Sequence, residues 1–275
     1  MDLRALVQGQ RGFLFLPLIY RLAARLEQMS WAELTEDPIS SAFALRSAQQ
    51  LFRLPAVITH FRIGVEAEAC GADLGRDREG DWQQLRAGAA PEALGMRTLE
   101  QAPLAQVLDV TGRLSAELRS QANTVGVVTG PRTLVSLFST PPSSLAEFYA
   151  LLARAYAERG VALLLVVEDR RVAVRQGVER PAEGTVMAAF FNVARYFRLP
   201  TVLLDHAAAG PVAGFDLTVG GRGRPTLPAS ILEAPPERPA EWRDAGAPLL
   251  LTEWEVPPHL SADRLVAWLD AFAKL

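Results

Sequence analysis

Cysteine and lysine each occur once in this chain of 275 residues, and their scarcity excludes several mechanisms. The single Cys70 permits no intrachain disulfide, which fits a reducing cytoplasm, and it rules out a zinc site built from cysteines. The single Lys274 stands beside the last residue of the sequence, so the body of the chain offers no lysine for a Schiff base or for anchoring pyridoxal phosphate. A Walker-A phosphate loop also requires a lysine and is excluded.

The chain also lacks an excess of positive charge and a long hydrophobic run. Its formal net charge is −3 at pH 7 and its pI is near 5.7, so no general positive field attracts nucleic acid or an anionic membrane. The apolar run from Phe13 to Tyr20 has eight residues, whereas a membrane helix needs roughly twenty. Asp2 precedes this run and Arg21 follows it, which is not typical of a secretion signal. We expect a cytoplasmic protein without nucleic-acid or membrane partners.

The chain does contain eight short apolar runs that alternate with segments of helical periodicity. The runs span residues 13–19, 56–59, 124–128, 162–167, 201–204, 215–219, 229–232 and 249–251. This alternation predicts an α/β fold with a parallel sheet, and eight strands predict one TIM-type (β/α)8 barrel over residues 1–275. The connections after the fifth and sixth runs are too short for a crossover helix, so we expect the barrel to be trimmed there. Residues 72–99, rich in charge and glycine, are expected to form a loop over the rim or a flexible lid.

Several helix starts carry capping signals. Ser30 with Glu33, and Ser144 with Glu147, have the spacing of a capping box. A second helix is expected after Asp37 and Pro38, over residues 41–52. An apolar stripe behind Ser261 predicts a final helix on the outside of the barrel.

Residues that follow the strands are the candidates for function, because the carboxyl ends of all strands in a parallel barrel open onto one face. Arg21 and Arg25 stand four apart, so both project from one face of a helix and could clamp carboxylates; the alternative is a pair of solvated arginines. His60 could be a general acid or base, or a hydrogen-bonded structural residue. Glu66 and Glu68 are two apart and share no helical face, which argues against a catalytic carboxylate pair.

Further candidates follow the fourth and fifth runs. Glu168 could orient a substrate or form a local ion pair with the arginines after it. Asp205 and His206 could contribute to a metal site together with carboxylates of neighbouring strands, but their spacing carries no metal signature, and we expect no metal.

The segment PLIYRLAARL, residues 17–26, resembles the N-terminal motif Arg-x-Ala-Gly-Arg of the uroporphyrinogen decarboxylase superfamily, with Arg21, Ala23 and Arg25 as the matching positions. The later segments ELTEDPISSAFALRSAQQLF, VEAEACGADL, VTGPRTL and EVPPHLSADRLVAWLDAF are similar to that superfamily in order and spacing. The resemblance implies an α/β barrel, commonly a homodimer. It also implies one of two chemistries. Decarboxylases of the superfamily remove acetate carboxyl groups from a tetrapyrrole without a cofactor, and related methyltransferases use zinc to activate a thiol and take methyl groups from corrinoid proteins.

Three functional positions of the decarboxylases are changed in this chain. Arg62 stands where they carry an aspartate, Leu137 where they carry a tyrosine, and Trp254 where they carry a histidine. The zinc site of the methyltransferases requires one histidine and two cysteines, and of these only His206 is present near the expected strand.

We therefore expect a divergent enzyme of this superfamily, acting without a cofactor as a carboxy-lyase on an anionic, tetrapyrrole-like molecule of porphyrin biosynthesis. The alternatives are a methyltransferase of the corrinoid or thiol type and a non-catalytic protein that binds a tetrapyrrole or corrinoid. Substrate contacts are expected from Arg21, Arg25, Arg62, Arg132, Glu168 and Trp254. Proton transfer is expected from His60 or His206, with Asp205 beside the latter.

Overall fold

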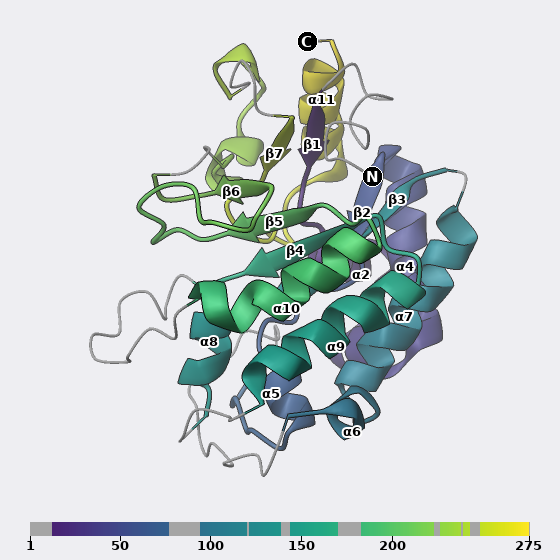
Figure 1. Cartoon of the computed structure of the whole chain (residues 1–275). Coiled ribbons are helices and arrows are strands. Elements are labelled where there is room, and N and C mark those ends of the chain that lie inside the picture. Colours follow the sequence, from purple (N-terminus) through teal and green to yellow (C-terminus); the bar gives the residue numbers. More distant parts are fainter. Residues whose placement is uncertain are drawn as a thin grey trace.

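Strands and helices alternate along the chain, and every paired strand runs parallel to its neighbour (Figure 1). The computed structural model describes residues 13–76, 94–119, 121–138, 144–169, 183–222, 226–237, 239–242 and 248–274. Most of the loop predicted at residues 72–99 lies outside the described residues. The fold is an α/β barrel of the TIM type, as predicted. No helix in these described ranges is long and apolar enough to cross a membrane.

The strands form two hydrogen-bonded ladders. The larger is a five-stranded sheet in the order β2-β3-β4-β5-β6, and in the smaller β1 pairs with β7. The strands are β1 (Leu14–Leu16), β2 (Ala56–Ile58), β3 (Asn123–Thr129), β4 (Leu163–Val167), β5 (Thr201–Leu204), β6 (Leu217–Val219) and β7 (Leu249–Leu251). Within the described part of the chain, no ladder joins β1 to β2, so side-chain packing rather than strand pairing connects the two sheets there.

The seventh predicted strand, residues 229–232, is wrong. Ala229–Glu233 form a 3-10 helix, η2, and the neighbouring Leu227 makes a single parallel bridge to Thr252. Pro228 precedes the run and lacks the backbone N–H that a strand would use in a ladder. Leu232 is nevertheless fully buried, so the apolar run serves packing in a different backbone conformation.

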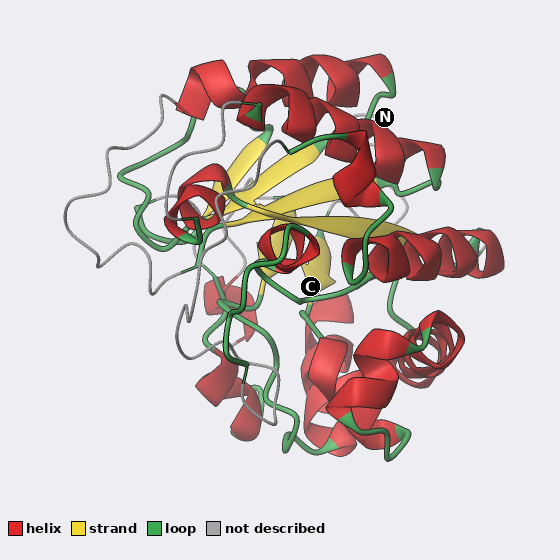
Figure 2. Cartoon of the chain, turned by 90° about the horizontal axis from the view of Figure 1, so that it is seen from below, coloured by secondary structure: helices red, strands yellow, loops and turns green. Residues whose placement is uncertain are grey.

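The short connections are confirmed. Residues 205–216 lead from β5 to β6 without a helix, and the described residues between β6 and η2 contain none. Elsewhere helices flank the strands, and Figure 2 shows them around the central strands. They are α2 (Tyr20–Leu26), α3 (Trp31–Glu36), α4 (Pro38–Phe52), α5 (Val65–Ala69), α6 (Met96–Leu99), α7 (Leu104–Leu118), α8 (Pro131–Ser136), α9 (Leu145–Glu158), α10 (Glu183–Tyr196) and α11 (Ala262–Ala273), with a 3-10 helix η3 (Pro239–Trp242).

The helix starts follow the sequence signals with two corrections. Ser30 and Glu33 form the predicted capping box, and Ser261 accepts a hydrogen bond from the backbone of Arg264 at the start of α11. Helix α4 begins at Pro38 rather than near Ser41, since the Asp37 side chain caps it and proline suits a first helical position. Ser144 does not cap α9, because its hydroxyl donates to the carbonyl oxygen of Leu94 at 2.8 Å.

The hydrophobic core has two parts, separated by the wall of strands. Val125 and Val127 of β3 pack with Leu165 of β4 in an inner cluster that extends to α2, α4 and α11. The intervening residues, such as Val128 and Leu164, belong to an outer cluster with α9 and α10, which lie side by side in Figure 1. Alternation of this kind is expected for strands that are covered on both faces. The parallel pairing of the strands places their carboxyl ends at one end of the barrel.

Candidate active site

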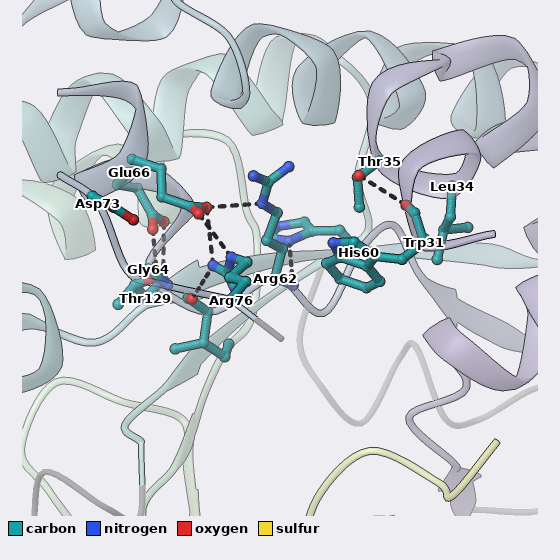
Figure 3. Close-up of polar contacts among 12 residues, drawn as sticks. Trp31, Leu34, Thr35, His60, Arg62, Gly64, Glu66, Asp73, Arg76 and Thr129 are labelled. Carbon is teal, nitrogen blue, oxygen red and sulfur yellow. Dashed lines mark hydrogen bonds and ion pairs between the residues drawn. The ribbon is translucent and has the colours of Figure 1, made fainter. Parts of the chain in front are cut away.

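Charged side chains after β2 form a network, which we call the Arg62 cluster. It consists of Arg62, Glu68 of α5 and Arg76 (Figure 3). The Nε of Arg62 donates to Glu68 Oε2 at 2.8 Å, and Arg76 donates to Glu68 through Nε at 2.7 Å and Nη2 at 2.9 Å. Burial alone raises the pKa of Glu68, but its hydrogen bonds and the charges of the two arginines lower it overall. Two guanidinium groups share one carboxylate, so the cluster carries one excess positive charge.

The outer end of Arg62 is left open. Its two terminal nitrogens make no hydrogen bond with any described residue, and in Figure 3 they carry no dashed line. The side chain is only 14% exposed, so water covers little of it. Donors of a partly buried cation cost free energy when they remain unpaired. Arg62 therefore presents a planar fork suited to a carboxylate or another anionic group.

A second network, the Arg132 cluster, joins the ends of β3, β4 and β5. Glu168 accepts hydrogen bonds from the backbone N–H groups of Arg132 at 3.0 Å and Thr133 at 2.8 Å, at the start of α8. Arg132 also lies 3.5 Å from Glu168 through its Nε and pairs through Nη2 with Asp205. Burial raises the pKa of Glu168, although the charge of Arg132 and the hydrogen bonds oppose this effect. Thus Arg132 is ion-paired with two carboxylates of the protein itself.

Glycine at position 130 permits the Arg132 cluster to form. A Cβ atom there would lie 2.3 Å from the Cδ of Glu168, a separation that real atoms do not adopt. The backbone N–H of Gly130 also donates to the carbonyl oxygen of Val167 at 2.7 Å. The end of β3 therefore presses directly against the Glu168 carboxylate.

His206 is half-buried and has one ring nitrogen available. Its Nε2 lies 2.7 Å from the backbone carbonyl oxygen of Glu253. A carbonyl only accepts hydrogen bonds, so Nε2 carries the proton and Nδ1 of the neutral ring bears a lone pair. No described residue bonds to Nδ1. His206 is thus oriented by the backbone and able to accept a proton.

His60 lies in a different environment, 1% exposed. Its Nε2 is 2.8 Å from the carbonyl oxygen of Val127 and 3.0 Å from the hydroxyl of Tyr156, and its Nδ1 accepts from the backbone N–H of Arg62 at 3.1 Å. Burial lowers the pKa of His60 to about 4. Protein groups therefore occupy both nitrogens, and the ring fixes the backbone that carries Arg62.

Arg21 and Arg25 contact different parts of the segment after β7. Arg21 pairs with Glu255, its Nε donating to Oε2 at 2.7 Å, and its backbone N–H donates to Oε1 of the same carboxylate. Arg25 is exposed and donates through Nη1 to the carbonyl oxygens of Pro258 at 2.8 Å and Leu260 at 3.3 Å. In this geometry both arginines connect α2 to the C-terminal segment.

Trp254 lies between the two halves of the candidate site. Its ring centroid is 5.1 Å from that of Phe61, which precedes Arg62, and 6.5 Å from that of His206. The three rings follow β2, β7 and β5, and we call them the aromatic row. The row connects the Arg62 side of the barrel mouth with the His206 side.

Sequence reasoning missed Arg76 of the Arg62 cluster and the buried contacts of Glu66. Arg76 falls in the stretch predicted as a loop, where no periodicity marks individual residues. Glu66 is fully buried and accepts from the backbone N–H of Thr129 at 2.9 Å; burial raises its pKa. Glu66 and Glu68, two residues apart, bond to different groups. Only the position of Arg76 beside Gly75, shortly after a helix, could have signalled a turn back to Glu68.

The residues present do not fit the zinc site of the methyltransferases. The described ranges contain no grouping of three or more His, Cys, Asp or Glu side chains that could hold a metal ion. Cys70, at the end of α5, lies with its Sγ 3.8 Å from the hydroxyl of Thr98, whereas His206 follows β5. One cysteine cannot supply the two thiolates that such a site requires.

Comparison with known proteins gives a likeness of fold. No protein-family model matches the sequence, and no curated protein matches it. A solved structure of a 2,3-dimethylmalate lyase of the PEP mutase/isocitrate lyase superfamily aligns over 98% of this chain and 84% of its own, with 12% identity and a TM-score of 0.46, too low to support an argument. A methyltransferase from Methanosarcina mazei aligns over 99% of both chains, with 15% identity and a TM-score of 0.71. Over its whole length, this chain therefore has the fold of that methyltransferase.

Proposed function

We propose that this protein is an enzyme that binds a small carboxylate-bearing molecule at the carboxyl-terminal mouth of the barrel and transfers a methyl group to it. The observation that carries the proposal is the open fork of Arg62, whose terminal nitrogens lack a partner among the described residues. Such a fork binds a carboxylate through two parallel hydrogen bonds. His206 lies at the other end of the aromatic row from Phe61 and supplies a group that accepts a proton.

The charge balance favours a ligand with one carboxylate. Glu255 pairs with Arg21, Glu68 with Arg76, and both Glu168 and Asp205 with Arg132. Of the two charged clusters described above, the Arg62 cluster is the one in which positive charge exceeds negative charge. A tetrapyrrole with many carboxylates would require several open cations. The site therefore supports a smaller acid better than the tetrapyrrole predicted from the sequence.

Methyl transfer fits the available side chains without a metal. The bond between the methyl carbon and its donor breaks, and the electron pair stays with the donor. The acceptor atom forms a bond to the methyl carbon, and its proton passes to Nδ1 of His206. The likeness of fold to a methyltransferase supports this reaction class.

A carboxy-lyase reaction is the second candidate, because the same two groups would serve it. Arg62 would hold the substrate while a carbon–carbon bond breaks and carbon dioxide leaves. A protonated His206 would then deliver its proton to the carbon that keeps the electron pair. This version needs no cofactor. A homodimer and a cytoplasmic location stay predictions.

Binding at Arg62 can be measured by calorimetry with mercaptoacetate, which carries one carboxylate, and with uncharged 2-mercaptoethanol. We expect wild type to bind only the acid, and Arg62→Gln to weaken binding roughly tenfold to hundredfold, the range for a charge-assisted hydrogen bond. Arg46→Gln is the matched control, because Arg46 forms an exposed ion pair with Glu117. Equal affinity in wild type and Arg62→Gln would contradict the proposal.

The reaction class can be assigned with two assays on the same protein. Methylcobalamin with mercaptoacetate should yield methylthioacetate by mass spectrometry, and His206→Gln should lower the rate by roughly 10² or more, whereas His259→Gln should not. Uroporphyrinogen and small carboxylic acids are tested separately for release of carbon dioxide. Release without methylation would replace methyl transfer by the second candidate. Binding with neither reaction would leave a non-catalytic binding protein and reject both.

A further inference from the structure

We infer that Asp205 and Arg132 are positioning residues for His206: their ion pair fixes the turn after β5 and so keeps Nδ1 as the open nitrogen. The inference rests on the proposed role of His206. The sequence predicted a catalytic Asp205 and a substrate contact by Arg132. The contacts of the Asp205 carboxylate are to the backbone of Ala207 and to Arg132, rather than to the imidazole ring.

Hydrogen bonds on both sides of His206 close the turn. The backbone N–H of Asp205 donates to the carbonyl oxygen of Val219 at 2.9 Å, which ties the turn to β6. The side-chain Oδ1 of Asp205 accepts from the backbone N–H of Ala207 at 2.9 Å. The backbone carbonyl oxygen of Asp205 accepts from the backbone N–H of Ala208 at 3.3 Å. A side chain that hydrogen-bonds the backbone two residues later is a common device for holding a turn. His206 is the residue enclosed by these bonds.

The loop after β6 packs directly on the same turn. A Cβ atom at Gly221 would lie 2.4 Å from the carbonyl oxygen of Ala208, and one at Gly220 would lie 2.9 Å from that of Asp205. Both glycines have positive φ angles, +87° and +53° for Gly220 and Gly221. Arg222 also donates from its backbone N–H to Ala208 at 2.8 Å. The turn is thus confined from outside, while Asp205 holds it from within.

Arg132 makes the position of Asp205 depend on β3 and β4. Asp205 is 3% exposed and the Arg132 side chain 12%, so their charges are largely removed from water. Removing one partner leaves the other charge buried without compensation. Arg132 is itself held by Glu168, so the ends of three adjacent strands set the orientation of the His206 ring.

Nuclear magnetic resonance can test the inference without a substrate. The chain has three histidines, so the ring nitrogens of His206 can be assigned individually. In the neutral ring, wild-type His206 should show the pattern of an imidazole protonated only on Nε2. Asp205→Ala removes the turn-closing acceptor and the ion pair, and should bring the two nitrogen shifts toward a common average. Asp205→Asn keeps an acceptor for the backbone N–H of Ala207 but removes the ion pair, and Arg132→Gln removes the ion pair from the other side. Each of these two single variants should move the nitrogen shifts part of the way toward the common average.

Asp216→Asn is the control, because Asp216 accepts from the backbone N–H of Thr201 at 2.8 Å, at the opposite end of β5. An unchanged His60 signal shows that each variant has kept its core. An unaltered tautomer in Asp205→Ala, or an equal effect of Asp216→Asn, overturns the inference. If Asp205→Ala changes the tautomer but neither Asp205→Asn nor Arg132→Gln does, Arg132 has no part in positioning His206. Since no turnover is measured, an inactive wild type would count against the proposed reaction and not against the positioning role.

Discussion

His60 and His206 each stand two residues beyond the end of a strand, yet they have opposite surroundings. His60 is enclosed by Val127 of β3 and by Tyr156 of α9, which follows 96 residues later in the chain. His206 keeps one nitrogen open beside Trp254. Both positions could be predicted from the sequence, because a residue that follows a strand of a parallel barrel lies at its mouth. The difference in burial between the two histidines could not be predicted, because it depends on side chains from helices distant in the sequence.

The low pKa of His60 makes a prediction for stability. Its pKa is about 4 in the folded protein against 6.5 for an ordinary histidine, so between these values the unfolded chain binds a proton that the folded protein does not. The stabilisation that the neutral His60 ring gives the folded protein is complete above pH 6.5 and is lost progressively as the pH falls toward 4. At about 1.4 kcal/mol per pKa unit, the loss is on the order of 3 kcal/mol.

Chemical denaturation between pH 7 and pH 4.5 measures this contribution by comparing wild type with His60→Gln. The variant should be less stable at pH 7 but should lose less stability on acidification. Burial raises the pKa values of Glu66 and Glu168, so in part of this pH range acidification increases stability through these two groups. Both glutamates are present in wild type and in the variant, so their effect cancels in the comparison. His259→Gln is the control, since the His259 side chain is 71% exposed. Parallel pH curves for wild type and His60→Gln would show that this histidine does not titrate as its burial implies.

The charged partners show a similar limit of sequence reasoning. Arg62 and Arg132 were predicted as substrate contacts from their places after strands, but the same geometry gives them different roles. Glu68 occupies one side of Arg62 and leaves its outer end open, whereas Glu168 and Asp205 enclose Arg132. The carboxylates on Arg132 come from two other strand ends. Only the folded chain shows how much of each guanidinium remains for a ligand.

At the scale of single elements, local signals predicted most helix starts and failed where a distant group competed. Ser30 and Asp37 act as caps because their partners lie within three residues. Ser144 has the same spacing to an acidic residue, but the carbonyl group of Leu94 takes its hydroxyl. The run at 229–232 failed for another reason. Three apolar residues within a run of four suit a short buried strand or a 3-10 turn equally well, and Pro228 decides between them.

Two glycine-to-alanine substitutions of opposite expected effect test the packing of these elements. Gly130→Ala should destabilise the protein by about 1–3 kcal/mol, because the added methyl group overlaps the Glu168 carboxylate at the start of α8. Gly112→Ala should stabilise it by about 0.5–1 kcal/mol, because Gly112 lies inside α7 and a Cβ there meets only Arg159 Cγ at an ordinary 3.7 Å. Urea denaturation gives both values. A neutral Gly130→Ala would mean that the carboxylate moves away without cost.

For the molecule as a whole, the repeated alternation of strand and helix was enough to predict the barrel and the face that carries its polar side chains. This part of the prediction succeeded because it depends on many segments together, so one misassigned run does not change the result. The division of the strands into two ladders could not be read from the sequence. It depends on which strand edges meet, and short apolar runs carry little information about their neighbours.

The two ladders bear on how related proteins could come to accept substrates of different size. Arg62 and His206 follow strands of the same five-stranded sheet, whose backbone hydrogen bonds fix the spacing between them. Trp254 follows β7 of the other sheet. The carbonyl oxygen of the neighbouring Glu253 holds the His206 ring, whereas the distance of Trp254 from the Arg62 side depends on side-chain packing against Phe61. Substitutions in the layer of side chains between the two sheets can therefore move Trp254 relative to Arg62 without changing the backbone spacing of the five-stranded sheet. Directed evolution of substrate range should find its accessible positions in that layer.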